Sequence, residues 1–149
     1  MTEAYGEGTV LSGDTLVAGH AVAQTVVLEK PLSFWGGYDS AAGRIIDRGH
    51  PLAGASLAGR IMVMAHAKGS SSSSSVLAEA VRNGTGPVGI ILKERDLIIS
   101  IGAIVAAELY AIAVPVVCVP EAVYDTIAAA SGPIRIEAED GIGGARIYL

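Results

Sequence analysis

A run of six serines is the part of this sequence whose residue types could most directly do chemistry. Ser70–Ser75 follows Lys68 and Gly69, and it lies between a short apolar segment and a segment with helical spacing. The first turn of a helix offers unpaired N–H groups and the positive end of the helix dipole, which stabilise an anionic ligand or a deprotonated serine oxygen. A serine hydroxyl needs such help to act as a base at neutral pH.

A flexible linker is the alternative interpretation of the same run, because glycine and serine dominate linkers. A linker here would divide the chain near its middle. However, a segment typical of a buried strand leads directly into the run, and a helical pattern leads directly out of it. This context favours a strand, a glycine–serine turn and a helix.

A second candidate segment combines aromatic side chains with glycines. Ser33–Asp39 contains the only Phe and the only Trp of the chain, Phe34 and Trp35, followed by Gly36 and Gly37. The aromatic pair could be buried in the core with a turn behind it. Alternatively, it faces a ligand or a partner, and the glycines let backbone groups approach a small anion.

The histidines and the cysteine give weaker signals. His50, in Asp47–Leu52, could be catalytic, but a structural loop histidine is the favoured interpretation. Cys118 lies in the apolar segment Val116–Val119 and is predicted to be a buried residue without chemistry. A single cysteine excludes an intramolecular disulfide and a thiolate metal site within this chain, so we predict that the chain binds no metal by itself.

The elements that must position these residues follow from hydrophobic spacing. Gly8–Leu11 and Leu16–Leu28, around the turn Ser12–Asp14, predict an N-terminal β-hairpin. Glu29–Gly59 predicts a long ordered loop with one short strand, Gly43–Ile46. Further strands are predicted at Arg60–Ala65, Pro87–Leu92, Val114–Val119, Ile134–Ala138 and Ala145–Leu149, and helices at Val76–Arg82, Ile101–Ile112 and Glu121–Ala130. The alternation after residue 60 favours parallel βαβ connections, giving an α/β (mixed β/β/α) fold with a mixed sheet and about three helices.

Composition narrows the class of protein. The chain has 149 residues, of which 51% are hydrophobic, and a formal charge of −5 without a basic cluster. We therefore expect a single domain over residues 1–149 and no nucleic-acid partner. The longest uncharged stretch, Thr15–Leu28, is too short and too polar to span a membrane. Met1–Ala4 is acidic and does not begin a secretory signal, so the predicted compartment is the cytoplasm.

Several motifs taken together resemble one known family, the aconitase X group, and specifically its small swivelling subunit. The resemblance extends from about Gly8 to Pro120, and the ordered combination is more specific than any single motif. It rests on Leu32–Gly37, on Asp47-x-x-His50-Pro51-Leu52-x-Gly54, on Gly69-Ser70-Ser71, and on Ile101–Ala106 followed by Val114–Val117.

The resemblance implies an aconitase-type swivelling domain that closes over the active site of a hydro-lyase. A large subunit would carry the iron centre or iron–sulfur cluster, forming a heterodimer or a higher assembly with this chain. The family's proton acceptor corresponds to Ser70. The expected substrate-binding residues are Ser33, Phe34, Trp35, Gly36, Gly37, Lys68, Gly69 and Ser71. Lys68 stands where many relatives have Arg, and the arginine that aconitases have shortly after the serines is missing, so substrate contacts would be shared with the partner chain.

Two small carboxylate substrates are known for the family. Bacterial members act on cis-3-hydroxy-L-proline, giving Δ1-pyrroline-2-carboxylate, and archaeal members act on mevalonate 5-phosphate. The segment Ile98–Tyr110 resembles the bacterial pattern, and no basic cluster suggests a phosphate pocket, so the first substrate is predicted. A hypothesis of another class is a non-enzymatic module that grips a small anion or a protein with the Phe34–Trp35 loop and the glycine–serine turn.

Overall fold

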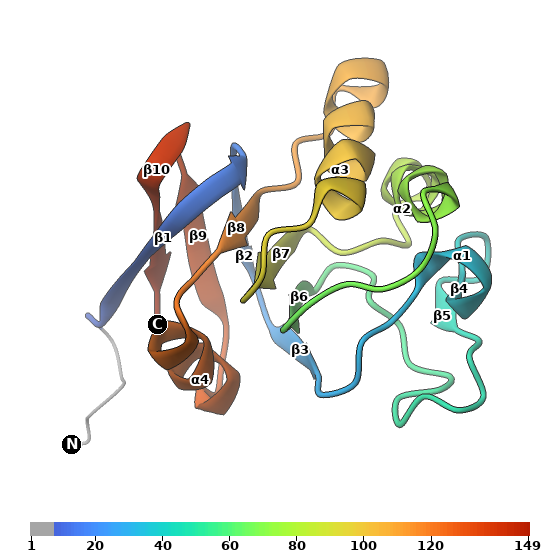
Figure 1. The fold of residues 1–149 in the computed structure, drawn as a ribbon, viewed down its shortest axis with the longest axis horizontal. Helices are drawn as coiled ribbons and strands as arrows, with labels where there is room; N and C mark the ends of the chain where they lie inside the picture. The colour runs from blue at the N-terminus through green and yellow to red at the C-terminus, as the bar shows by residue number, and fades with distance from the viewer. Residues whose placement is uncertain (1–7) are drawn as a thin grey trace.

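The fold is known from a computed structural model that describes residues 8–149. The predicted absence of a signal at Met1–Ala4 falls outside these residues. The elements in chain order are β1 (Val10–Val17), β2 (Gly19–Ala23), β3 (Thr25–Leu28), α1 (Phe34–Gly37), β4 (Tyr38–Asp39), β5 (Arg44–Ile45), β6 (Ile61–Met64), α2 (Ser72–Asn83), β7 (Gly89–Leu92), α3 (Leu97–Tyr110), β8 (Val116–Cys118), α4 (Glu121–Ala129), β9 (Ile134–Ala138) and β10 (Gly141–Tyr148) (Figure 1).

Eight strands form one mixed sheet in the order β2-β9-β10-β1-β8-β7-β6-β3. The strands β3, β6, β7 and β8 are mutually parallel, whereas β1, β10, β9 and β2 are antiparallel to their neighbours. The helices α2 and α3 connect β6 to β7 and β7 to β8. The mixed sheet and the parallel connections after residue 60 are therefore confirmed.

The sheet curls so that its antiparallel half covers one face of its parallel half. A Cβ atom added at Gly89 in β7 would lie 3.1 Å from Cδ1 of Ile136 in β9 and 3.3 Å from Cβ of Ala21 in β2. One buried apolar cluster fills the space between the two halves, and a second lies between the parallel half and the helices. Figure 1 shows α2 and α3 on the opposite side of β6–β8 from β1, β9 and β10, which confirms the β/β/α layers.

The predicted N-terminal hairpin is wrong. β1 pairs with β10 and β8, and β2 pairs with β9, so the two strands are not neighbours in the sheet. Gly13, placed in the predicted turn, lies inside β1 opposite Ala145. A Cβ atom there would lie 2.7 Å from Cγ1 of Val119 and 2.8 Å from the carbonyl oxygen of Cys118. The glycine thus allows the backbone at the end of β8 to approach closely, and this tertiary constraint overrides the local turn pattern.

The long segment between β3 and β6 is ordered, as predicted, and is anchored by buried side chains. The hydroxyl of Tyr38 donates to the carbonyl of Thr85 at 2.6 Å and accepts from the backbone N–H of Leu57 at 3.1 Å. His50 is buried; its Nδ1 accepts from the N–H of Leu52, so its Nε2 carries the hydrogen and donates to the carbonyl of Lys30 at 2.8 Å. Both ring nitrogens hold backbone groups, which fits the structural interpretation of His50.

Two helices begin earlier than their hydrophobic spacing predicts. α2 starts at Ser72, so the last four serines of the run form its first turn. α3 starts at Leu97 because Asp96 caps it, with Oδ2 accepting from the N–H of Ile99 at 2.6 Å. No helix within residues 8–149 has both the length and the apolar character that a membrane span requires.

The close approach at Gly13 leads to a testable prediction. Gly13→Ala should lower the free energy of unfolding by about 1 to 3 kcal/mol, because its Cβ would overlap the backbone at the end of β8. Gly49→Ala is the matched control, since the nearest atom to an added Cβ lies 3.5 Å away; its effect should stay within about 0.5 kcal/mol. Urea unfolding followed by circular dichroism measures both, and equal stabilities would contradict the packing argument.

Candidate functional site

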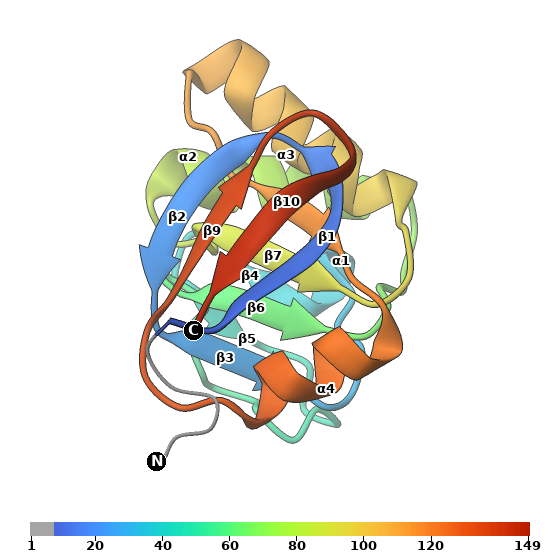
Figure 2. The same ribbon diagram turned by 90° about the vertical axis from the view of Figure 1, so that its left-hand side faces the viewer.

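The serine run lies at the edge of the sheet where the parallel strands end. Figure 2 shows β3, β6 and β7 pointing in the same direction, and the chain leaves β6 at this edge to reach α2. Ser70 closes the turn before the helix: its Oγ accepts from the N–H of Ser72 at 3.3 Å, and its carbonyl accepts from the N–H of Ser73 at 3.0 Å. The run is therefore the start of a helix, and the linker interpretation is wrong.

The loop Ser33–Gly37 packs directly against this turn. The contact joins Ser33 to Ser73, which are 40 residues apart in the sequence. The side chain of Ser73 is buried, and its Oγ accepts from the backbone N–H of Trp35 at 3.0 Å. The same Oγ lies 3.4 Å from Oγ of Ser33. A Cβ atom at Gly69 would overlap Ser33 Oγ and lie 3.1 Å from Ser73 Oγ. The two segments singled out in the sequence thus form one surface.

The aromatic pair divides between the core and the surface. Phe34 is fully buried, and its ring packs edge-on against Tyr38 with 5.6 Å between the centroids. Trp35 is 60% exposed beside Gly36, which is also exposed and has a φ of +79°. Gly37 is buried, and a Cβ atom there would lie 3.1 Å from the Leu32 side chain. The buried interpretation holds for Phe34, and Gly37 is buried beside it, whereas Trp35 and Gly36 lie at the surface. The substrate contacts predicted for these four residues stay predictions.

The remaining predicted site residues are exposed on the same turn. Lys68, Gly69, Ser70 and Ser71 all lie at the surface. A negative charge on Ser70 Oγ would be stabilised by the N–H of Ser72 and by the positive end of the α2 dipole. In an exposed position this stabilisation is weakened by water, whereas a dry site strengthens it. The arrangement therefore suits proton transfer only once something covers the turn.

Ser73 is a residue of this surface to which the sequence analysis gave no role. It lies three residues after Ser70, within a run whose members look alike in composition. The helical spacing from Val76 onward, extended backward, would have turned one serine of the run toward the core. That spacing was the available signal.

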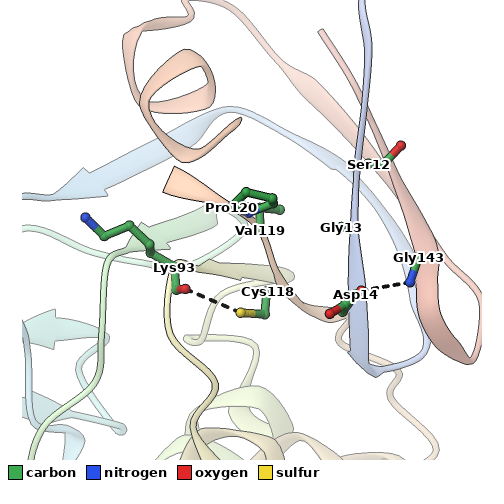
Figure 3. Close-up of a pocket in the computed structure, with 8 residues that line it drawn as sticks. All are labelled: Ser12, Gly13, Asp14, Lys93, Cys118, Val119, Pro120 and Gly143. Atoms are coloured by element: carbon green, nitrogen blue, oxygen red, sulfur yellow. Dashed lines mark hydrogen bonds between the residues drawn. The ribbon is translucent and has the colours of Figure 1, made fainter. Parts of the chain in front are cut away.

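A separate cleft of about 420 Å³ opens between β1, β8 and the β9–β10 hairpin. Its polar groups are engaged with one another: Cys118 Sγ donates to the carbonyl of Lys93 at 3.4 Å, and Asp14 Oδ1 accepts from the N–H of Gly143 at 2.8 Å. Figure 3 shows the Lys93 ammonium group pointing away from these residues. Burial raises the pKa of the Cys118 thiol, which disfavours the nucleophilic thiolate. No predicted site residue lines this cleft, and we assign it no reaction.

An iron centre would need several metal-binding side chains close together. Within residues 8–149, no three His, Cys, Asp or Glu side chains lie close enough together to coordinate an ion. The donor set of the described part of the chain therefore does not fit an iron site.

Comparisons of the sequence and of the fold with known proteins all point to one family. Residues 10–143 match the family model of the aconitase X swivel domain. The chain is 44% identical over 115 residues to a cis-3-hydroxy-L-proline dehydratase of Pseudomonas aeruginosa, covering 77% of this chain and 20% of that protein. It is 40% identical over 96 residues to the phosphomevalonate dehydratase small subunit of Pyrococcus furiosus, covering 64% and 72% of the two chains.

The fold has a solved counterpart. The crystal structure of Thermococcus kodakaraensis aconitase X in its holo form matches with a TM-score of 0.78 and 32% identity, covering 95% of this chain and 99% of that chain. By contrast, the chain spans only about a fifth of the length of cis-3-hydroxy-L-proline dehydratases such as those of Pseudomonas aeruginosa and Hypocrea jecorina.

The buried hydroxyl of Ser73 gives the prediction for this surface. Ser73→Ala should lower the free energy of unfolding by about 1 to 3 kcal/mol and loosen the loop, because the N–H of Trp35 loses its acceptor. Trp35 is the only tryptophan, so acrylamide quenching of its fluorescence reports on this loop and should increase.

The exposed Ser75 provides the matched control in the same helical turn. Ser75→Ala should leave both the stability and the quenching unchanged. The same quenching in Ser73→Ala as in the unmodified chain would mean that the loop does not depend on this hydroxyl.

Proposed function

The chain belongs to the aconitase X swivel-domain family, and from this premise we propose that it is the small subunit of a dehydratase that removes water from a hydroxylated carboxylate. The observation that supports this most directly is the surface on which Ser70, at the start of α2, lies beside the Trp35 loop. It supplies a candidate base, a helix dipole and an exposed aromatic side chain at the carboxyl edge of a parallel sheet, where ligands bind in open α/β folds.

The proposed substrate is cis-3-hydroxy-L-proline, and the proposed product is Δ1-pyrroline-2-carboxylate. This choice is supported by the 44% identity over 77% of the chain to the Pseudomonas aeruginosa dehydratase. Mevalonate 5-phosphate is the second candidate, supported by the small subunits of archaeal phosphomevalonate dehydratases, of which the chain covers about two thirds to three quarters.

In the proposed reaction, Oγ of Ser70 accepts the proton from the carbon next to the substrate carboxylate. The electron pair of that C–H bond forms a double bond to the neighbouring carbon, whose hydroxyl leaves as hydroxide and takes up a proton to give water. The resulting enamine becomes Δ1-pyrroline-2-carboxylate when the ring nitrogen loses its proton and the carbon that carried the hydroxyl gains one. The N–H of Ser72, 3.3 Å from Ser70 Oγ, and the α2 dipole favour the deprotonated form of the serine that this step requires.

The neighbouring exposed residues have roles in binding. Lys68 supplies a positive charge beside the turn for the substrate carboxylate, and Trp35 shields the reacting carbon from water. The backbone of Gly36, at φ +79°, offers a close approach to the carboxylate without a side chain in the way. Ser33 and Gly69 lie where the two segments meet. The absence of a side chain at Gly69 lets the segments approach each other, since an added Cβ there would overlap the Ser33 hydroxyl.

The iron centre expected for this family is proposed to lie on an aconitase X large subunit. When bound, such a centre supplies a Lewis acid for the departing hydroxyl. In this proposal the two chains share the active site. This chain supplies the proton acceptor and part of the carboxylate-binding surface, and the large subunit holds the metal and covers the turn.

The proposed base is tested with Ser70→Ala in a complex of this chain with an aconitase X large subunit. Turnover of cis-3-hydroxy-L-proline should fall by about a hundredfold to ten-thousandfold, the usual contribution of a general base. Ser75→Ala serves as control and should keep normal turnover. Mevalonate 5-phosphate is assayed in parallel to decide between the two substrates.

Two outcomes would contradict the proposal at different levels. Near-normal turnover by Ser70→Ala would remove Ser70 as the proton acceptor and leave the dehydratase assignment intact. If the unmodified complex turned over neither substrate, or if no complex formed, the dehydratase assignment would fail, and the binding-module hypothesis would be favoured.

The divided roles of the aromatic pair give a second test. Trp35→Ala should change the free energy of unfolding by less than about 1 kcal/mol, because most of its side chain is already in water. Turnover per folded molecule should still fall by about tenfold or more, since Trp35 is proposed to shield and position the substrate. Phe34→Ala should instead cost about 3 to 5 kcal/mol of stability, as truncation of a fully buried aromatic does.

Thermal unfolding and turnover measured on the same two variants separate these effects. Unchanged turnover per folded molecule in Trp35→Ala would place Trp35 outside the reaction.

A further inference from the structure

The outer side of helix α3 is apolar from its start at Leu97 until the exposed Glu108 in its last turn. From Leu97 to Ala107 it contains no charged residue. Its inner side is buried against the core through residues such as Ile99, Ala103 and Ala106. Its outer face, defined here as Leu97, Ile101 and Ile104, is 73%, 41% and 44% exposed.

These three residues form one continuous stripe. Spacings of four and three residues place successive side chains on the same side of a helix. Leu109 lies at the flank of the stripe and is 69% exposed. A surface helix normally carries charged and polar residues on the side away from the core, and a helix that is apolar all round is normally buried. An exposed apolar outer face is therefore unusual for a helix at the surface of a protein.

The outer face adjoins the candidate site. α3 begins five residues after β7 ends, so its first turn lies at the same edge of the sheet as Ser70. The hydroxyl of Ser74, in the first turn of α2, donates to the carbonyl of Ile98 at 2.7 Å. At Gly102 the two helices approach so closely that an added Cβ would lie 3.0 Å from Cδ2 of Leu77. Within residues 8–149, Figures 1 and 2 show no other element on the side of α3 that points away from the sheet.

We propose that the outer face of α3 is a docking surface for the large subunit, an inference that rests on the proposed function. The same domain accounts for 20% of the Pseudomonas aeruginosa dehydratase, so most of that protein lies outside the matched segment. A body that covers the exposed Ser70 turn from the carboxyl edge meets the first turn of α3 next, because the hydrogen bond from Ser74 to Ile98 joins the two helix starts. One partner then covers both surfaces.

A membrane and a second copy of this chain are the other possible occupants. The 14 residues of α3 are too few to span a bilayer. Self-association through the outer face would compete with binding of the large subunit. Sedimentation of the free chain and titration with the large subunit distinguish these two occupants.

The test compares two double variants of the full chain. Ile101→Gln/Ile104→Gln replaces the centre of the outer face with residues that preserve helix propensity. Val22→Gln/Ile142→Gln is the matched control, because these residues are 67% and 88% exposed but lie on β2 and β10, outside the helical layer. All four side chains are exposed to some degree, so circular dichroism and the thermal midpoint of each free chain should stay close to those of the unmodified chain.

Affinity for an aconitase X large subunit is measured by titration, and turnover is measured across a range of small-chain concentrations. The outer-face variant should bind at least about tenfold more weakly, as expected when central apolar contacts are lost, while the control stays within about twofold. At saturating concentration the outer-face variant should recover the unmodified kcat, because docking is affected and chemistry is not.

Three results would overturn the proposal. If the unmodified complex forms and turns over while the outer-face variant binds within about twofold of it, the docking surface is wrong and the dehydratase assignment stands. If the outer-face variant converts a dimer of this chain to a monomer in sedimentation without weakening large-subunit binding, the face belongs to a second copy. If the unmodified chain neither binds a large subunit nor supports turnover, the proposed function fails and the docking surface with it.

Discussion

The candidate site depends on one buried hydroxyl. Ser73 faces the core from the first turn of α2, and a buried hydroxyl needs a hydrogen-bond partner. It finds one in the N–H of Trp35, and this joins the loop after β3 to the turn after β6. Gly69 makes the contact possible, because no side chain fits between it and Ser33. This hydrogen bond holds the two segments together, so that Ser70 and Trp35 are exposed next to each other on one surface.

The parallel half of the fold could be predicted from the sequence because its elements carry strong local patterns. Short apolar runs alternate with helical spacing from residue 60 to residue 119, and the structure has β6, α2, β7, α3 and β8 there. The family resemblance, carried by motifs in this region and in the loop before it, is likewise confirmed by the match over residues 10–143. The N-terminal strands were harder: Ser12–Asp14 has turn composition, but Gly13 is required by the neighbouring backbone of Cys118. Contacts across more than 100 residues cannot be recognised in a local pattern.

The candidate site could be located from residue types but not resolved in detail. Glycine beside serine, and glycine beside tryptophan, marked both segments that the structure brings together. Composition alone did not say which of the two adjacent aromatic side chains enters the core. The backbone decides this: Trp35 has an extended ψ of 115° and Gly36 a φ of +79°, so the chain reverses there and sends Phe34 inward. The N–H of Trp35 at this reversal is held by Ser73, which lies far away in the sequence.

Two surfaces of the described chain meet at the edge where the parallel strands end: the Ser70 turn lies there, and the outer face of α3 begins there. The Ser70 turn is exposed to water, which weakens the electrostatic help that a serine base needs. The outer face of α3 is exposed although it is apolar. A large subunit placed over this edge would remove water from both at once, so the free energy gained by covering α3 would support the drying of the turn. In such an assembly, the affinity between the chains and the basicity of Ser70 are coupled, because the same contact that holds the domain in place also creates the environment in which its serine can accept a proton.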